Sequence, residues 1–369
     1  MIVRCQDCGC EKEFNLNDWR CACGGAWEPV RLRDFIQSDI QFDDYSIWRY
    51  GRMLGLDLEK PLVRMGVGWT PLVTTKLFQR KVFLKLEFLS PSGSFKDRGV
   101  NTMVNQLVFM GAKSVIEDSS GNAGASVAAH AARFRIGAEI YVPSYASQAK
   151  KHQIAIYGAS VIPILGPRKA AEEAAQAAIA PGKAYASHVF NPAYLVGHVT
   201  AAYEVWEQLK GDVPDWILCP VAQGGQFLGY WLGFKKLLEA GLIKRLPHLV
   251  AVQAKQVAPI HQAWKRGMDY IPSIKTPGKT IAEGVAIPGP IRDKRILQAL
   301  TETKGNTLAI DEDEILQAQD LAAKLGYYIE PTSALVFAGL KKILGWLSEG
   351  ERVLLTLTGS GLKGAPQYR

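Results

Sequence analysis

Apolar and polar residues are arranged along most of the chain in two recurring patterns. Short apolar runs typical of buried strands are followed by longer stretches with helical spacing. The strand-like runs lie at residues 82–87, 114–118, 138–143, 159–164, 216–221, 248–253 and 352–358. The helix-like stretches lie at residues 123–134, 169–180, 199–210, 311–325 and 333–347. This alternation predicts an α/β fold in which helices cover both faces of parallel sheets.

The region before this alternation has a different pattern. Residues 30–60 mix polar and aromatic side chains, with Trp48, Tyr50 and Arg52 close together, and predict a helical connector that packs on the main body. A chain of 369 residues is longer than one typical domain. Two domains and a small appendage are therefore expected.

Five of the six cysteines lie within the first 23 residues. Cys5 and Cys8 form one pair, Cys21 and Cys23 form a second, and both pairs are flanked by glycine. Two such pairs are typical of a zinc ribbon, in which four thiolates fill a tetrahedral site and leave no position for a substrate. We therefore predict a structural zinc, with Cys10 as a spare. The alternative is a disulfide or free-thiol cluster, which a cytosolic setting disfavours.

Composition and charge narrow the class of protein. The net charge is +8, but the basic residues are scattered, whereas a nucleic-acid surface shows a denser basic stripe interleaved with aromatic residues. No apolar run approaches the roughly 20 residues of a membrane span, and the N-terminus lacks the apolar core of a secretory signal. We therefore expect a cytoplasmic protein with neither nucleic acid nor membrane as a partner. The excess of basic over acidic residues favours binding of an anionic small molecule.

A single lysine occupies a Ser/Gly-rich turn at residues 91–99 (PSGSFKDRG), directly after the strand-like run at 82–87. The backbone at such a junction can hold Lys96 in place and partly desolvate its amine. An amine in that state can act as a Schiff-base nucleophile toward an aldehyde. The alternative is an ordinary helix start with Ser94 as its N-cap and a solvated first turn.

Three further segments lie at the ends of strand-like runs, where parallel sheets bind their ligands. Residues 117–126 (EDSSGNAGAS) lead into an alanine-rich helix, and residues 222–226 (AQGGQ) open another helix. Residues 358–363 (TGSGLK) follow the last strand. One cofactor cleft could gather all of these segments, although each is also compatible with an ordinary turn or helix cap.

These four segments, in this order, resemble the fold-type II pyridoxal-phosphate enzymes, and within them the threonine synthase family. The resemblance runs from about residue 60 to the C-terminus. It implies pyridoxal 5'-phosphate as the cofactor and a homodimer as the assembly. It also implies a smaller α/β domain at 95–189 and a large cofactor domain made of 31–94 and 190–369. Residues 1–30 then form the zinc-ribbon-like appendage, which several members of the family share.

The resemblance also implies roles for individual residues. Lys96 would bond to the cofactor and then act as a general base once a substrate has displaced it. Asn122 would contact the ring hydroxyl of the cofactor, and Thr358 the pyridine nitrogen. The cofactor phosphate would be bound by Gln223, Gly224, Gly225 and Gln226. The substrate would be bound by Ser92, Ser119, Ser120, Gly121 and Tyr194.

The function implied by the resemblance is that of a lyase that converts O-phosphohomoserine and water to threonine and phosphate. Tyr194 departs from the family, because an arginine often stands there and tyrosine does not replace a bidentate phosphate donor. One alternative is therefore a paralogue that acts as a serine/threonine dehydratase or as a β-replacing synthase on an O-activated serine. A remote alternative is a non-catalytic binding protein on the same fold, against which Lys96 and Asn122 argue.

Overall fold

The computed structural model describes residues 1–16, 18–30 and 32–364. Internal contacts divide it into two compact units. Unit 1 comprises Met1–Trp69, Ser90–Thr200 and the residues from Lys363 onward, and unit 2 comprises Thr70–Leu89 and Ala201–Leu362. The division falls within helix α5 (Pro192–Gln208). The domain boundaries expected from the sequence stay a prediction.

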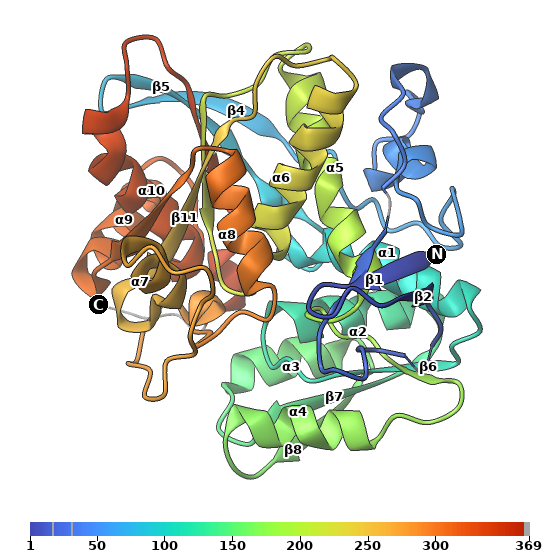
Figure 1. Ribbon diagram of the computed structural model, residues 1–369. Helices are drawn as coiled ribbons and strands as arrows, with labels where there is room; N and C mark the ends of the chain where they lie inside the picture. Colours follow the sequence, from blue (N-terminus) through green and yellow to red (C-terminus); the bar gives the residue numbers. More distant parts are fainter. Residues whose placement is uncertain (17, 31, 365–369) are drawn as a thin grey trace. The chain divides into compact units, whose positions relative to one another are not determined.

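Unit 1 is built on a four-stranded parallel sheet with the strand order β8-β7-β6-β9 (Figure 1). Its strands are β6 (Ser114–Glu117), β7 (Gly137–Pro143), β8 (Ser160–Ile164) and β9 (Lys183–Tyr185). Its helices are α1 (Lys96–Phe109), α2 (Asn122–Phe134), α3 (Gln148–Ile156) and α4 (Arg168–Ala177). Helices α2 and α4 both pack against β7, and α1 packs beside α2. Small and β-branched side chains of these elements form the core of the unit.

The N-terminal part of unit 1 carries a small antiparallel sheet of β1 (Ile2–Cys5), β2 (Glu11–Glu13) and β3 (Trp27–Pro29). The predicted connector at 30–60 is helical only in the 3-10 segments η1 (Gln37–Asp39) and η2 (Ile47–Met53). It packs on α1, where Trp48 Nε1 donates to Asn101 Oδ1 at 2.7 Å. Nearby, Asn105 Oδ1 accepts from the Leu62 N–H at 2.8 Å.

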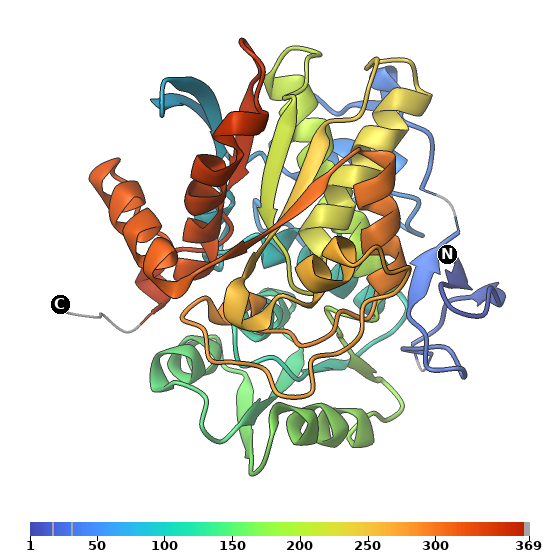
Figure 2. The same ribbon diagram turned by 60° about the vertical axis from the view of Figure 1, so that its left-hand side comes forward.

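Unit 2 is built on a six-stranded sheet with the order β12-β11-β10-β13-β5-β4. Its strands are β4 (Leu72–Leu77), β5 (Arg80–Lys85), β10 (Trp216–Pro220), β11 (His248–Ala254), β12 (Asn306–Ile310) and β13 (Val353–Thr356). Its helices are α6 (Gly225–Glu239), α7 (Pro259–Lys265), α8 (Asp293–Glu302), α9 (Glu312–Lys324) and α10 (Pro331–Ile343). Short 3-10 turns are η3 (Glu87–Leu89), η4 (Lys255–Val257), η5 (Glu283–Val285), η6 (Leu344–Trp346) and η7 (Gly361–Lys363). Helix α10 packs on the central strands, and α9 packs beside α10 (Figure 2).

Strand β4 corrects the prediction of parallel sheets, because it pairs antiparallel with β5 and makes the sheet mixed. The two strands are joined by a two-residue turn at Phe78 and Gln79, whose φ angles are 48° and 64°. Positive φ at both residues is the feature of a tight type I′ hairpin turn, which usually contains Asn-Gly or Asp-Gly. The absence of those residues here explains why the pattern predicted no hairpin.

Helix α9 and helix α10 begin where local sequence favours a helix start. Asp311 and Glu314 form a capping box at the start of α9, in which each side chain accepts from the backbone of the other. Pro331 occupies the first position of α10, where a missing N–H costs nothing. Among the described residues, no helix is long and apolar enough to cross a membrane.

Candidate functional site

Lys96 is the first residue of α1, so a loop delivers it and the helix then holds it in place. The N-cap of α1 is Phe95, and no side chain caps this helix, so the alternative in which Ser94 is the N-cap is not observed. The hydroxyl groups of Ser90 and Ser94 are buried without a hydrogen-bond partner in the described part of the chain. The turn that carries the lysine therefore keeps two buried hydroxyls available for a polar ligand.

Asp97 fixes this turn in place and was not singled out from the sequence. Its buried carboxylate accepts from the N–H of Ser92 at 2.7 Å, the hydroxyl of Ser92 at 2.6 Å and the hydroxyl of Ser126 at 2.5 Å. The carbonyl of Ser92 accepts from Gln153 at 3.0 Å and from Lys363 at 2.8 Å. The hydroxyl of Ser92 thus already has a structural partner, and its role toward a substrate stays a prediction.

The start of α2 forms a second part of the site in unit 1. The helix begins at Asn122, and its N-cap Gly121 provides no side-chain hydrogen bond. The hydroxyl of Ser119 accepts from the N–H of Gly121 at 3.2 Å, and Ser119, Ser120, Gly121 and Asn122 are all partly exposed. A helix N-terminus without a side-chain cap offers backbone N–H groups and a positive dipole end to an anion.

Buried ionisable side chains adjoin this loop, and no sequence pattern pointed to them as a group. Glu117 ends β6, and its Oε1 lies 2.6 Å from Nδ1 of His188, while its buried Oε2 has no partner among the described residues. Asp118 forms an ion pair with Arg168 at 2.9 Å and accepts from the hydroxyl of Tyr185 at 2.8 Å. Glu117, Asp118 and His188 lie close enough to hold a metal ion. However, Arg168 and Tyr185 already engage both carboxylate oxygens of Asp118.

Burial shifts the pKa values of Glu117 and His188. It raises the pKa of Glu117 well above the usual value, and the neighbouring charge of Asp118 raises it further. The charges of Arg168 and Lys96 oppose this rise in the pKa of Glu117. Burial, followed by the charge of Lys96, lowers the pKa of His188 to about 3. The charge of Lys96 therefore lowers the pKa of both Glu117 and His188.

Tyr194 lies near the start of α5, and its ring packs against α1. A Cβ atom at Gly99 would lie 2.6 Å from the ring, so only glycine permits this approach. The ring centroid of Tyr194 is 4.7 Å from that of His198 and 6.1 Å from that of His188. The tyrosine hydroxyl is buried without a partner in the described structure. Burial, followed by the charge of Glu117, raises its pKa well above the usual value.

In unit 2, the turn between β10 and α6 carries the predicted phosphate-binding residues. Gly224 is the N-cap of α6 and has φ of +87°, and Gly225 is the first residue of the helix. Gln223 Oε1 accepts from the N–H of Ile291 at 3.0 Å. Gln226 is buried, yet neither its amide nitrogen nor its amide oxygen has a partner among the described residues. The turn combines a glycine backbone, a helix N-terminus and an unsatisfied amide.

Thr358 follows β13 and is held by α10. Its hydroxyl lies 3.0 Å from that of Ser333, which also accepts from the N–H of Gly359 at 2.8 Å. Strands β10 and β13 are parallel neighbours, so the turn after β10 and the segment after β13 emerge at the same sheet edge. Unit 2 thus brings together Thr358 and the Gly224 turn. Unit 1 brings together Lys96, the start of α2 and Tyr194.

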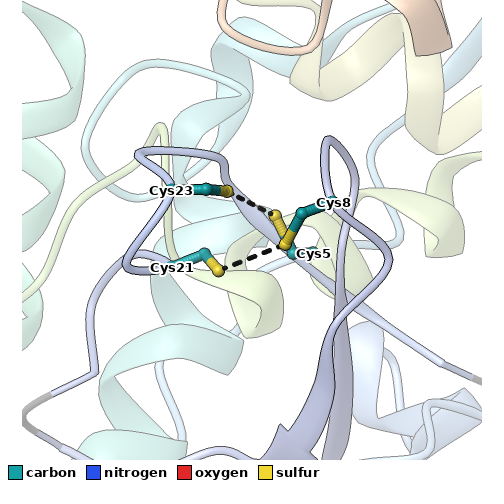
Figure 3. A group of neighbouring side chains, drawn as sticks. All are labelled: Cys5, Cys8, Cys21 and Cys23. Atoms are coloured by element: carbon teal, nitrogen blue, oxygen red, sulfur yellow. Dashed lines mark hydrogen bonds between the residues drawn. The ribbon is translucent and has the colours of Figure 1, made fainter.

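The predicted thiol cluster also forms within unit 1 (Figure 3). The Sγ atoms of Cys5 and Cys23 are 3.4 Å apart, those of Cys8 and Cys21 are 3.6 Å apart, and none of the four cysteines is in a disulfide. All four sulfurs lie within 4.8 Å of one another. Zn–S bonds of about 2.3 Å place tetrahedral sulfurs about 3.8 Å apart. Cys10 lies outside the cluster, with its Sγ 3.9 Å from the carbonyl of Glu11.

Comparison with known sequences identifies relatives over nearly the whole chain. The family model described as pyridoxal-phosphate dependent enzyme matches residues 63–359. The threonine synthase of Methanocaldococcus jannaschii is 33% identical over an alignment of 380 residues, gaps included, and this alignment covers 98% of this chain and 93% of the relative. The threonine synthase of Methanosarcina acetivorans is 30% identical, and the match covers 98% of this chain and 92% of the relative.

Comparison with solved structures identifies the same fold. The crystal structure of a T.th. threonine deaminase superposes with a TM-score of 0.70 at 27% identity, over 80% of this chain and 94% of that protein. Maize serine racemase superposes with a TM-score of 0.69 at 22% identity, over 79% of this chain and 88% of the racemase. The second match concerns the fold alone.

Proposed function

Because the chain belongs to the family of pyridoxal-phosphate-dependent enzymes, we propose that it is a threonine synthase. Such an enzyme is a lyase that converts O-phosphohomoserine and water to threonine and phosphate. The observation that carries the proposal is the match of two threonine synthases across 98% of this chain at 33% and 30% identity. The proposal keeps Lys96 as the catalytic residue.

The side chains of unit 1 suit a pyridoxal phosphate ligand. When bound, this cofactor draws electrons from the substrate α-carbon into its ring. Lys96 would bond to the cofactor aldehyde, and its released amine would move the proton at the substrate α-carbon. The amide of Asn122 would contact the ring hydroxyl. The loop of Ser119, Ser120 and Gly121 would bind the substrate carboxylate, with the Gly121 N–H released from the Ser119 hydroxyl on binding, because the helix end there has no side-chain cap.

The side chains of unit 2 suit other polar groups of pyridoxal phosphate. The N–H groups of Gly224 and Gly225 at the start of α6 would bind the cofactor phosphate, with Gln223 and Gln226 beside them. The unsatisfied buried amide of Gln226 supports this assignment. A buried amide without a partner costs about 1–3 kcal/mol, and a bound ligand would remove that cost. The hydroxyl of Thr358 would contact the pyridine nitrogen and leave it largely unprotonated.

The test is incubation of the purified, cofactor-loaded protein with O-phosphohomoserine, with threonine and phosphate measured together. Equal amounts of both products, lost in Lys96→Ala and kept in Lys113→Ala, are expected. Lys113 is an exposed lysine of the same unit and serves as the matched control. Native turnover by Lys96→Ala would overturn the assignment of Lys96.

A second candidate function follows from Tyr194, whose phenol lacks the charge of the arginine often found there. The second candidate is a serine/threonine dehydratase or a β-replacing synthase that acts on an O-activated serine. The resemblance to threonine deaminase at a TM-score of 0.70 supports this alternative. Absence of threonine from O-phosphohomoserine, with keto acid formed from serine or threonine, would favour a dehydratase. A non-catalytic binding protein would give none of these products.

We also propose that Cys5, Cys8, Cys21 and Cys23 bind one structural zinc ion. The sulfur separations of 3.4 and 3.6 Å support this, since they are close to the edges of a zinc–thiolate tetrahedron. A backbone hydrogen bond lowers the pKa of Cys21, but burial and the neighbouring thiols raise it to about 12, so the Cys21 thiol ionises only with help from a cation. Metal analysis should find zinc in the wild type and in Cys10→Ser but not in Cys21→Ser. Equal zinc in all three would refute the site.

The remaining expectations concern partners and location. We propose a homodimer that acts in the cytoplasm on a phosphorylated amino acid, without nucleic acid or membrane as a partner. The homodimer is tested by light scattering coupled to gel filtration, where a mass of one chain would refute it.

A further inference from the structure

The cysteine ribbon has no part in the proposed chemistry, yet two of its residues are built into the main body of unit 1. Trp19 and Ala26 lie along the chain on either side of the pair Cys21 and Cys23. Ala26 is fully buried, and both residues pack in one apolar cluster with side chains of β6, β9 and α4. The half of the ribbon that carries this cysteine pair is therefore anchored on the parallel sheet.

The contact between the ribbon and β9 is aromatic. The ring of Trp19 meets that of Tyr185 edge to face, with the ring centroids 5.3 Å apart. It meets the ring of Phe190 in the same way at 5.1 Å, and the guanidinium of Arg20 lies 4.5 Å from its own centroid. Edge-to-face contacts at these separations are favourable and directional. Trp19 therefore helps to fix the position of the Tyr185 ring.

Tyr185 in turn contacts the residue that precedes the substrate-binding loop. Its hydroxyl donates to Asp118 Oδ1 at 2.8 Å. Asp118 is buried and directly precedes Ser119, the first residue of the loop proposed to bind the substrate carboxylate. Arg168 of α4 donates to the Asp118 carbonyl at 2.6 Å and to Oδ2 at 2.9 Å. A continuous series of contacts thus joins Trp19, Tyr185 and Asp118 to this loop.

We propose that the ribbon is a positioning element for the substrate-binding loop at 119–121, and that Trp19 and Tyr185 transmit its position. The inference rests on the proposed roles of the zinc site and of this loop. Coordination of zinc by Cys21 and Cys23 would fix the segment that carries Trp19. Loss of the metal then loosens the aromatic contact, and the hydrogen bond from Tyr185 to the start of the loop weakens with it. Both aromatic residues act through that hydrogen bond and are positioning residues.

The experiment is hydrogen exchange, measured by mass spectrometry on the purified, cofactor-loaded protein without substrate. The segment to follow is 117–125, in which the Gly121 N–H bonds to the Ser119 hydroxyl and the Ala125 N–H to the Gly121 carbonyl. Trp19→Ala should speed this exchange about tenfold, which corresponds to about 1.4 kcal/mol of lost protection. Trp19→Phe keeps an aromatic edge and should restore most of the protection.

Tyr185→Phe separates the hydrogen bond from the packing. It keeps the ring that Trp19 contacts and removes only the hydroxyl that reaches Asp118, so exchange of the loop should again rise. Trp19→Ala should then add little in the Tyr185→Phe background, because both changes act through the same hydrogen bond. Tyr141→Phe is the matched control, since Tyr141 of β7 packs against the same cluster but its hydroxyl donates to Glu139. Exchange in this control should equal that of the wild type.

Two further measurements connect the ribbon and the substrate to the same loop. Cys21→Ser should raise exchange of the loop, whereas Cys10→Ser should not, because Cys10 lies outside the sulfur cluster. In Tyr185→Phe the KM for O-phosphohomoserine should rise by about three- to tenfold while kcat stays within about twofold, since the loop binds the carboxylate equally before and during the reaction. A loss of folded protein alone would lower kcat and leave KM unchanged.

Normal exchange of residues 117–125 in the variants that fold would overturn the proposal, and so would additive effects of Trp19→Ala and Tyr185→Phe. If Trp19→Ala does not fold, Tyr185→Phe and Cys21→Ser decide by the same measurement. Faster exchange with an unchanged KM would refute the link to the substrate. The exchange measurement needs no turnover, so a failure to form threonine from O-phosphohomoserine would count against the proposed function and leave the positioning role of the ribbon standing.

Discussion

Replacement of Asp97 by asparagine tests whether the buried carboxylate holds the turn that carries the catalytic lysine. Asp97 accepts three hydrogen bonds, two from Ser92 and one from Ser126, at distances between 2.5 and 2.7 Å. Asparagine has nearly the same shape but no charge. With the amide oxygen in the place of Oδ2, the bond from the Ser92 N–H becomes neutral, and the amide NH2 group donates to the two hydroxyls instead of accepting from them. With the amide turned the other way, its NH2 group faces the Ser92 N–H and that bond is lost.

The expected magnitude follows from the number of bonds. A hydrogen bond to a charged group contributes about 1.5–3 kcal/mol, and a neutral one about 0.5–1.5 kcal/mol. A loss of about 1 kcal/mol at each of three bonds lowers the free energy of unfolding by roughly 3 kcal/mol. Because Ser92 and Lys96 share this turn, the variant should also retain less cofactor after gel filtration.

The assay is urea unfolding of Asp97→Asn, followed by circular dichroism at neutral pH. Asp269→Asn is the matched control, since Asp269 is exposed after α7, and its cost should stay below about 0.5 kcal/mol. A cost for Asp97→Asn equal to that of the control, together with normal cofactor retention, would refute the reasoning.

Three other predictions follow from buried groups. The amine of Lys85 forms a buried ion pair with Glu204 at 2.8 Å, so Lys85→Met should lower the free energy of urea unfolding by about 3–5 kcal/mol, and adding Glu204→Leu should recover most of that loss. Gly224→Ala should lose about 1–2 kcal/mol and retain less cofactor, because φ is +87° and its Cβ would lie 2.8 Å from a side chain of α8. Between about pH 7 and pH 5, His188 takes up a proton in the unfolded chain but not in the folded chain. The free energy of unfolding should therefore fall by roughly 2 kcal/mol over this range. Protonation of folded Glu117, whose pKa is raised, offsets part of this cost, so urea unfolding of Glu117→Gln should be more acid-sensitive than that of the wild type.

The positions of the central strands of unit 2 could be predicted because these strands are buried on both faces. Such strands appear as continuous apolar runs, and the runs at 216–221, 248–253 and 352–358 coincide closely with β10, β11 and β13. Strands β9 and β12 and helices α3 and α8 were not predicted. Strand β9 has only three residues, and β12 (NTLAI) has five, of which only Leu308, Ala309 and Ile310 are apolar. Short elements of this kind are specified by the neighbours with which they pair.

The candidate site could be predicted only where it is local in sequence. Lys96 and the turns at 119–122 and 222–226 are local motifs, and the structure places each at a strand end or a helix start. The pairing of Glu117 with His188 joins residues 71 positions apart, so no local pattern contains it. The role of Asp97 was hidden for a different reason, because an aspartate in a first helical turn is also typical of a solvated surface.

A substitution at Tyr194 should affect stability and substrate binding in opposite directions. Its hydroxyl is buried and has no partner among the described residues, so Tyr194→Phe removes a polar group that costs roughly 1–3 kcal/mol to bury. The free energy of urea unfolding should therefore stay the same or rise. If the hydroxyl binds the substrate, KM should rise by about tenfold, which corresponds to about 1.4 kcal/mol of lost binding. A fall in stability together with an unchanged KM would show that the phenol has a hidden structural partner and no role toward the substrate. Tyr194→Arg is not the matched experiment, because the tyrosine ring packs directly on Gly99 and a longer cation would be displaced from that contact.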